Sequence, residues 1–482
     1  MYQFSYQFTY ANLAIRVIAI IVVLVIVNRW TNPANKLSWT FIILLSPVLG
    51  LLLYMIFGRS SLTKKTQERM DSVNREVSAC LYQTPEIKEQ LAREDLSVYR
   101  QSRYINDWAG FPLYHNTSTK YYSCGEEMLP DMLAELEKAE HFIFLEYFIV
   151  DQGVMFDRIV EVLEQKSKEG VDVRLIYDDI GCINTLPPKY YKILQAKGIK
   201  CAAFNPFRPI MSVIMNNRDH RKIFVVDGKV GFTGGINLAD EYINVASRFG
   251  YWKDTGIRLE GEAVWSMTVM FLEMWNYINH SSEDYKQFMP QVYQKEPFEG
   301  DGFVQPYGDT PLDHETVGEN IYLNIINHAE RYVYIFTPYL IIDNEMLVSL
   351  CNAAKRGVDV RIVTPGIPDK KMIFLLTQSH YEPLLKCGVK IYQYTPGFIH
   401  AKSFLCDDKI GTVGSINLDY RSLFLHFECG VFMYKTKALM QLKEDCMDTF
   451  AASEEMTLEF CRGQNVFIRI FQGMMRLFAP LL

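Results

Sequence analysis

The sequence contains no cysteine arrangement that would hold a metal ion or a disulfide framework. Its ten cysteines are scattered, none forms a Cys-x-x-Cys pair, and none lies near histidines at zinc-site spacing. Scattered free thiols are typical of a reducing compartment, where cysteine serves as a small apolar core residue. The pattern therefore argues against a disulfide-stabilised secreted scaffold and against a structural zinc site.

An excess of basic residues is also missing. Lysine and arginine number 49 against 56 acidic residues, which gives a formal net charge of −7. Nucleic-acid-binding proteins usually carry a basic surface, so the balance argues against nucleic acid as a partner, although it permits a local basic groove. With 49% apolar and 22% charged residues, the 482-residue chain is globular and long enough for two domains.

Charged residues are absent from Leu37 to Phe57, a run of 21 positions. A helix of that length can cross ~30 Å of hydrocarbon, and a second apolar run, Ala11 to Val27, precedes it. A polar turn at residues 28–33 separates the two runs, and Pro47 is expected to kink the second helix. The pattern predicts a transmembrane helical hairpin over residues 1–58.

Two other interpretations of the N-terminus are a cleaved signal peptide and a pair of buried core helices. The signal peptide is disfavoured because no basic residue precedes Ile15 and no clear small-residue cleavage site follows. Four basic residues follow the second apolar run and two lie between the two runs: Arg59, Lys64, Lys65 and Arg69, against Arg29 and Lys36. By the positive-inside rule, we expect a multi-pass protein of the cell membrane with its C-terminal body in the cytoplasm.

Beyond a charged stretch at residues 59–110, predicted to be a helical linker, the chain repeats itself. His141–Tyr147 and Arg331–Thr337 are equivalent apolar runs, both predicted as strands. In each half a helical stretch ending in glycine follows, and then a second buried strand that begins Val-Asp-Val-Arg. Residues 111–295 and 296–450 are therefore predicted to be two α/β halves of a pseudo-dimer, whose strand order the sequence does not reveal.

Both halves contain His-x-Lys-x4-Asp, followed after six intervening residues by a glycine and then an asparagine. The two copies contain the following residues: His220, Lys222, Asp227 and Asn237, and His400, Lys402, Asp407, Ser415 and Asn417. On an extended strand, a His and a Lys two residues apart face the same side, and the Asp begins a hairpin turn. One copy alone would indicate a hairpin with a satisfied histidine, whereas two copies with identical spacing indicate a shared site.

These motifs resemble the signature of the phospholipase D superfamily, and the match covers nearly the whole C-terminal body. The N-terminal hairpin, the segment Phe57-Gly58-Arg59 and the stretch from Asn205 to Lys222 are similar to the bacterial cardiolipin synthase family. The resemblance implies two pseudo-symmetric phospholipase D-like α/β domains with a shared active site and no cofactor or metal. It also implies a membrane-bound phosphatidyltransferase that joins two phosphatidylglycerols into cardiolipin and releases glycerol.

The resemblance further implies a double displacement through a phosphohistidine. We expect His220 to attack phosphorus and His400 to act as acid and base, an assignment that the pseudo-symmetry could reverse. Imidazole suits both roles, because its ordinary pKa of ~6.5 allows a neutral and a protonated ring near pH 7. The lysines and asparagines of the motifs would hold the non-bridging oxygens, with Ser415 near the site.

In this superfamily an acidic residue beyond each motif orients an imidazole, and alignment of the two halves selects Asp254 and Glu428. Asp227 and Asp407, although part of the catalytic motif, lie at turns and are expected to brace the hairpins. His426 stands where many members have asparagine. It is either a tolerated substitute or a titratable neighbour of the site.

Two apolar segments are candidates for lipid contact. Pro209–Met215 has no counterpart in the second half and is either a core strand or part of the path by which lipid reaches the site. In the C-terminal tail, residues 451–482, four residues form a narrow polar stripe: Arg469, Gln472, Gly473 and Arg476. A helix there would lie at the membrane interface or pack on the second domain.

The sequence leaves three other functions open. The same chemistry could use water, as in a phospholipase D, or a different alcohol as the acceptor. A nuclease of the same superfamily is disfavoured by the negative net charge of the chain and by its apolar N-terminus. A catalytically inactive membrane scaffold is disfavoured by two intact motifs. Protein partners cannot be inferred.

Overall fold

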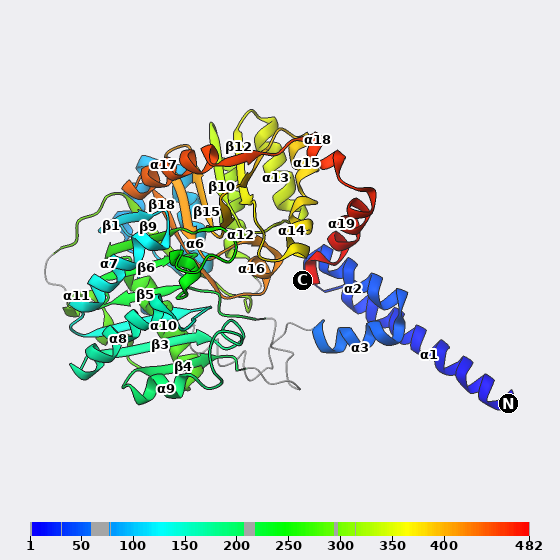
Figure 1. Cartoon of the computed structure of the whole chain (residues 1–482), viewed down its shortest axis with the longest axis horizontal. Coiled ribbons are helices and arrows are strands. Elements are labelled where there is room, and N and C mark those ends of the chain that lie inside the picture. Colours follow the sequence, from blue (N-terminus) through cyan, green and yellow to red (C-terminus); the bar gives the residue numbers. More distant parts are fainter. Residues whose placement is uncertain are drawn as a thin grey trace.

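The structure is a computed structural model of the chain, and it describes residues 2–29, 31–58, 77, 79–206, 217–293, 297–313 and 315–481. Two α/β halves lie against each other, and an N-terminal helical region projects from them with the C-terminus at its base (Figure 1). The apolar segment Pro209–Met215 lies outside the described residues, so its two interpretations stay predictions.

The N-terminal region forms one long helix and a tight helical hairpin: α1 (Tyr2–Val27), α2 (Pro33–Leu45) and α3 (Pro47–Phe57). The second apolar run is therefore not the single kinked span that the sequence predicted. Pro47 lacks the N–H that would continue the helix, and Ser46 leaves helical geometry with φ −141° and ψ 86°. The chain then folds back, so that the rings of Trp39 and Tyr54 lie 5.2 Å apart.

Within the described residues, this reversal leaves the predicted second span as two short helices. Across the described part of the chain, α1 is the one helix long and apolar enough to cross a bilayer, over Tyr10–Val27. α2 and α3, with 13 and 11 residues, are each too short to do so. The described N-terminus thus offers one candidate span followed by a short apolar hairpin.

The seven strands of the first sheet have equivalents in the same order in the second, which adds β19 at one edge, and the sequence did not reveal this order. The first sheet runs in the order β1 (Thr117–Tyr122), β8 (Gly256–Gly261), β6 (Val230–Gly234), β5 (Ile223–Val226), β2 (Phe142–Tyr147), β3 (Asp172–Asp178), β4 (Lys200–Phe204). The second runs in the order β9 (Phe303–Asp309), β18 (Glu428–Tyr434), β16 (Ile410–Gly414), β15 (Ser403–Cys406), β10 (Tyr332–Phe336), β12 (Asp359–Pro365), β13 (Lys390–Tyr394), β19 (Ser453–Glu455). β2, β3 and β4 are parallel, as are β10, β12 and β13, which confirms the duplicated α/β fold.

Helices surround both sheets. Those ahead of and within the first half are α5 (Pro85–Glu94), α6 (Leu96–Ala109), α7 (Gly125–Lys138), α8 (Val154–Lys168), α9 (Tyr191–Ala196), α10 (Val264–Asn279) and α11 (Pro290–Tyr293). Those of the second half and the C-terminus are α12 (Val317–His328), α13 (Asn344–Lys355), α14 (Lys371–Gln378), α15 (Tyr381–Lys386), α16 (Tyr420–Phe424), α17 (Lys437–Ala451), α18 (Leu458–Gly463) and α19 (Val466–Phe478). Gly170 and Gly357, just beyond α8 and α13, both have φ 95°, as expected of glycines that end helices.

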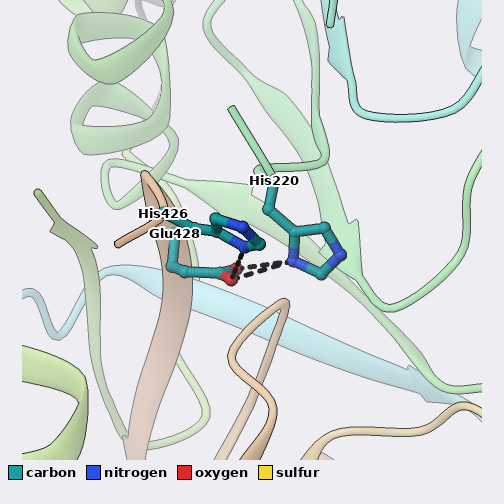
Figure 2. A group of neighbouring side chains, drawn as sticks. All are labelled: His220, His426 and Glu428. Carbon is teal, nitrogen blue, oxygen red and sulfur yellow. Dashed lines mark hydrogen bonds and ion pairs between the residues drawn. The ribbon is translucent and has the colours of Figure 1, made fainter. Parts of the chain in front are cut away.

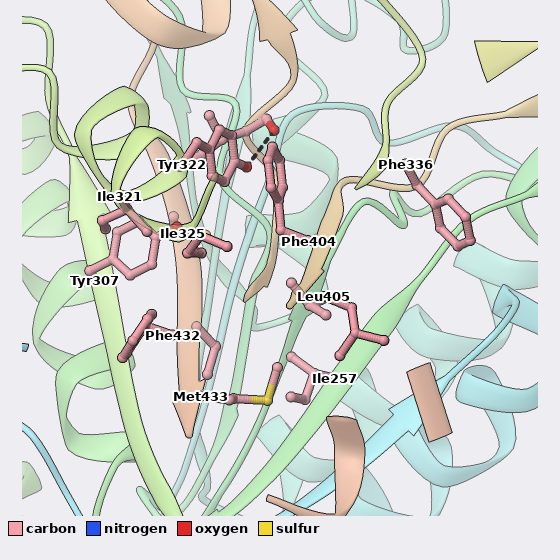
Figure 3. Packing of buried hydrophobic residues seen from close by; sticks show 14 of the residues in the cluster. Ile257, Tyr307, Ile321, Tyr322, Ile325, Phe336, Phe404, Leu405, Phe432 and Met433 are labelled. Carbon is pink, nitrogen blue, oxygen red and sulfur yellow. Dashed lines mark hydrogen bonds between the residues drawn. The ribbon is translucent and has the colours of Figure 1, made fainter. Parts of the chain in front are cut away.

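One hydrophobic core joins the two halves. Ile257 on β8 of the first half lies in the same cluster as Leu405 and Met433 of the second (Figure 3). Above them, Tyr322 of α12 stacks on Phe404 of β15 with ring centroids 4.0 Å apart. Close-packed interiors transmit strain and resist deformation, so residues at the seam between the halves are held in defined positions.

Each motif forms the predicted hairpin, β5 with β6 and β15 with β16. The carboxylate of Asp227 accepts N–H bonds from Glu140, His141 and Phe142, each at 2.8 Å. Asp407 accepts the equivalent three bonds, at 2.7, 2.9 and 2.8 Å, from the backbone ahead of and at the start of β10. Both carboxylates thus bind backbone at the turn end of their hairpins, away from the motif histidines.

We expect Asp227→Ala to destabilise the protein strongly and Asp227→Asn only slightly. Alanine leaves three N–H groups without an acceptor and places an ordinary residue at φ 51°, which together cost about 3 kcal/mol. Asparagine keeps one oxygen and tolerates this backbone region. Thermal unfolding in detergent and initial rates of the folded protein measure both effects. A stable asparagine variant that had lost activity would contradict the bracing role.

Candidate active site

Both motif histidines lie at the seam, and each is bound by a carboxylate from the other half. His220 Nδ1 is 2.9 Å from both carboxylate oxygens of Glu428. His400 Nδ1 is 2.7 Å from Asp254 Oδ2. All four side chains are buried. The sequence selected the two carboxylates, but the exchange of partners between the halves emerges from the structure.

Backbone pairing across the seam explains the exchange. β7 (Tyr251–Lys253) pairs in parallel with β14 (Gly397–Ile399), and His400 N donates to Lys253 O at 2.7 Å. At the opposite crossing, His220 N donates to Phe427 O at 2.9 Å. The accepting residue in each case immediately precedes the carboxylate residue. The same backbone bond that joins the halves therefore positions a carboxylate beside each imidazole.

The motif lysines are buried beside the histidines. Lys222 Nζ donates to His220 O at 2.5 Å, and Lys402 Nζ donates to His400 O in the same way. Burial lowers the pKa of Lys222 to about 8 and that of Lys402 to about 7, where the charge of Lys222 adds to the effect. An anion bound between these groups would offset the cost of burying them, so the site is suited to a phosphodiester.

The histidines are neutral near pH 7. Burial, reinforced by the nearby lysines, holds the pKa of His220 well below its ordinary value and lowers that of His400 to about 4. A carboxylate acceptor keeps the proton on Nδ1, which leaves the lone pair on Nε2. Each ring therefore has the form that a nucleophile or a base requires, and the charge of a bound phosphate would raise both pKa values.

Ser415 supports the second-half carboxylate. Its Oγ donates to Glu428 and accepts an N–H bond from Cys429 at 3.0 Å. The first motif has Gly235 at this position, where a Cβ atom would lie 2.0 Å from Asp254 Oδ1. Gly235 thus leaves room for the Asp254 carboxylate, whereas Ser415 forms a hydrogen bond with the Glu428 carboxylate. Ser415 thus lies near the site, as expected.

The two motif asparagines differ in their surroundings. Asn237 Oδ1 accepts from Ile149 N at 3.0 Å, and its Nδ2 donates to the Tyr242 hydroxyl at 2.7 Å. Its amide is therefore engaged largely by the protein, whereas the sequence predicted that it would hold phosphate oxygens. Asn417 is buried at the equivalent place in the second half.

His426 shares Glu428 with His220 (Figure 2). Its Nδ1 is 3.6 Å from Glu428 Oε1, and its ring centroid is 5.5 Å from that of His220. Arg421 Nε donates to His426 Nε2 at 3.4 Å, which leaves the proton on the nitrogen facing Glu428. Burial lowers the pKa of His426 to about 4, so it is a neutral neighbour of the carboxylate.

The same three residues could hold a metal ion. One donor atom from each of His220, His426 and Glu428 lies within 4.8 Å of the others, and two imidazoles with a carboxylate form a common zinc ligand set. In the described arrangement, however, Glu428 binds His220 directly. A metal ion bound there would replace this hydrogen bond.

The sequence did not indicate the aromatic side chains that surround the two histidines, which we call the aromatic walls. Trp252, Tyr242 and Phe398 surround His400, with ring centroids 5.4, 5.6 and 6.0 Å from it. Phe148 lies edge-on to His220 at 4.9 Å. Trp252 precedes Asp254 by two residues, as His426 precedes Glu428, so aligning the halves could have indicated it. The other aromatics carry no motif that marks them.

The site combines two neutral imidazoles, two buried lysines and two carboxylates at the seam of a duplicated α/β fold. This arrangement defines a phosphodiester-cleaving enzyme of the phospholipase D type. A family model described as cardiolipin synthase, phospholipase D-like domain, matches residues 132–247 and 322–448, and a phospholipase D-nuclease N-terminal model matches residues 17–59. The chain belongs to the cardiolipin synthase family of the phospholipase D superfamily and is a phosphatidyltransferase.

Relatives from other bacteria match the chain over nearly its full length. Cardiolipin synthase 1 of Bacillus cereus is 34% identical over 99% of this chain and 94% of its own. The cardiolipin synthase of Geobacillus kaustophilus is 34% identical over 97% and 92%. An uncharacterised protein of Streptococcus mutans is 45% identical over 95% and 99%.

The fold resembles that of a solved structure. The crystal structure of phosphatidylserine synthase from Haemophilus influenzae superposes with a TM-score of 0.58, covering 80% of this chain and 97% of the other. The two sequences are 13% identical, so this likeness concerns the fold alone.

Proposed function

We propose that the enzyme joins two phosphatidylglycerols into cardiolipin and releases glycerol, through a phosphohistidine intermediate. The buried, cross-paired imidazoles beside two lysines are the observation that carries this proposal. They would supply a nucleophile, an acid and, with phosphate bound, lysine cations to one anion-binding site. The full-length similarity to cardiolipin synthases of other bacteria supports the choice of substrates.

In the first step, His220 Nε2 attacks the phosphorus of one phosphatidylglycerol. The bond from phosphorus to the glycerol oxygen breaks, and His400, protonated once the phosphate is bound, gives its proton to the departing glycerol. In the second step, His400 removes the proton from a hydroxyl of another phosphatidylglycerol. That oxygen attacks phosphorus, the bond to His220 breaks, and cardiolipin forms.

The aromatic walls favour a lipid alcohol over water as the acceptor. Because the acceptor hydroxyl arrives where the first glycerol left, it passes beside His400, which Trp252, Tyr242 and Phe398 surround. Transfer in preference to hydrolysis depends on keeping water from the intermediate. Hydrolysis by a phospholipase D, or transfer to another alcohol, is the alternative.

The N-terminus would hold this site at the bilayer. We infer that α1 crosses the membrane. The α2–α3 hairpin then enters one leaflet and returns to the same side of the membrane, in place of the second full crossing predicted from the sequence. All six basic residues at 29–69 then lie on one side with the catalytic body. The positive-inside rule makes that side the cytoplasm.

We expect the purified enzyme to convert phosphatidylglycerol vesicles into cardiolipin and glycerol in the presence of EDTA, because the proposed steps use imidazoles and lysines. Thin-layer chromatography and mass spectrometry of the lipids identify the product. Phosphatidic acid instead of cardiolipin would indicate a phospholipase D. No lipid change, or activity lost with EDTA and restored by a metal ion, would contradict the proposal.

A further inference from the structure

The C-terminal helix α19 exposes an apolar side, and its polar side lines a groove beside α15 in which Arg469, Gly473 and Arg476 stay exposed. Phe467, Ile470 and Met474, spaced i, i+3 and i+7, are 77, 57 and 58% exposed. On the opposite side Gln472 is buried, and Arg469 lies 3.7 Å from Glu382 of α15. A helix of a water-soluble surface has the reverse arrangement. The polar stripe predicted from the sequence therefore faces the second half of the protein.

The exposed side of α19 continues into the apolar N-terminal helices. Ser38 Oγ of α2 donates to Leu477 O at 2.6 Å, and the rings of Phe41 and Phe478 lie 6.0 Å apart. Figure 1 shows α19 beside α2, at the base of the N-terminal region. Leu44 and Leu45 of α2 and Leu49 of α3 are also exposed. Segments more than 400 residues apart in the chain thus form one apolar surface.

We infer that α19 lies in the lipid interface on the catalytic side of the bilayer that α1 crosses, with Phe467, Ile470 and Met474 among the acyl chains. The inference rests on the membrane orientation of the proposed function. Continuity with the α1–α3 surface selects lipid as the occupant rather than another protein. Charge agrees, because no acidic residue follows Glu459 whereas three arginines do, which favours an anionic membrane.

This placement fixes the catalytic halves against the membrane at a second point. α1 alone would let the body rotate above the bilayer, whereas α19 with the α2–α3 hairpin defines which face meets the lipid. Two signals also hold a protein at a membrane better than one. The surface should therefore matter for substrate within a bilayer and not for substrate free in solution.

Lipid contact can be measured with full-length F467W in bilayers containing phosphatidylglycerol and brominated phosphatidylcholine. We expect the fluorescence that the substitution adds to be quenched about twofold, because bromine within the acyl region meets the indole. M447W is the matched control, since Met447 is 47% exposed on α17, remote from α1–α3. Added fluorescence that is equally quenched in both variants, or in neither, would overturn the inference.

Turnover provides an independent measurement. We expect F467S/I470S/M474S to lower cardiolipin formation in bilayers about tenfold while leaving turnover of a monomeric short-chain phosphatidylglycerol unchanged. M440S/M447S, with two equally exposed methionines of α17, is the control. Equal loss on both substrates would contradict the surface role. If the wild type turned over neither lipid while F467W was still quenched, the proposed function would fail and the surface would stand.

Discussion

His220→Gln is expected to abolish cardiolipin formation, with a loss of about 10⁴-fold or more. Glutamine can still reach Glu428 with its amide, but it has no basic lone pair with which to attack phosphorus. The expected adduct on the wild type is a phosphatidyl group on His220, trapped by rapid acid-free quenching and located by peptide mass spectrometry. The variant should form no adduct with any substrate.

His400→Gln should separate the two chemical steps. With phosphatidylglycerol it should be as inactive as the first variant, because the departing alkoxide needs a proton. With a phosphatidyl nitrophenol, whose leaving group needs none, we expect one burst of nitrophenol and an adduct that persists, since no base activates the acceptor. Burst and adduct in His220→Gln, and neither in His400→Gln, would show that the two roles are reversed.

Glu428→Gln and Asp254→Asn are expected to lower kcat/KM about 10²- to 10³-fold each while the protein stays folded. Both substitutions keep the shape but remove the charge that holds the proton on Nδ1 and stabilises the imidazolium. The Asp254 carboxylate raises the pKa of His400, so its loss lowers that pKa further. The pH optimum of Asp254→Asn should therefore move to lower pH.

The control for these variants is another buried carboxylate outside the imidazole pairs. Asp445 binds Lys253 Nζ at 2.5 Å, and Asp445→Asn should lower the melting temperature without shifting the pH optimum. A pH profile of Asp254→Asn that matched the wild type would reduce Asp254 to a structural role. The crossed pairing also predicts that Glu428→Gln impairs adduct formation on His220 itself, which single-turnover measurements with the activated substrate can test.

Some features of the N-terminus could be predicted from composition and others could not. An uncharged run of 21 residues is visible in the sequence, and so is Pro47 within it. Whether a proline kinks a helix or ends it depends on what the next segment can pack against. Here Tyr54 reaches Trp39, and the helix reverses. That contact joins residues 15 positions apart, and the periodicity of a helix does not predict that they meet.

The motif spacing and the internal repeat by themselves predicted the duplicated α/β fold, the two hairpins and the candidate site residues within the motifs, because these follow from local rules of strand alternation, turns and repeat length. Only the tertiary structure decided that His220 pairs with Glu428 and His400 with Asp254 across the seam. It also decided that Asn237 binds Tyr242 and that α19 turns its apolar side outward. The histidine–carboxylate partners, separated by some 150 to 200 residues, meet because the two halves pack together. Such packing produces no periodic pattern in the sequence from which the pairing could be predicted.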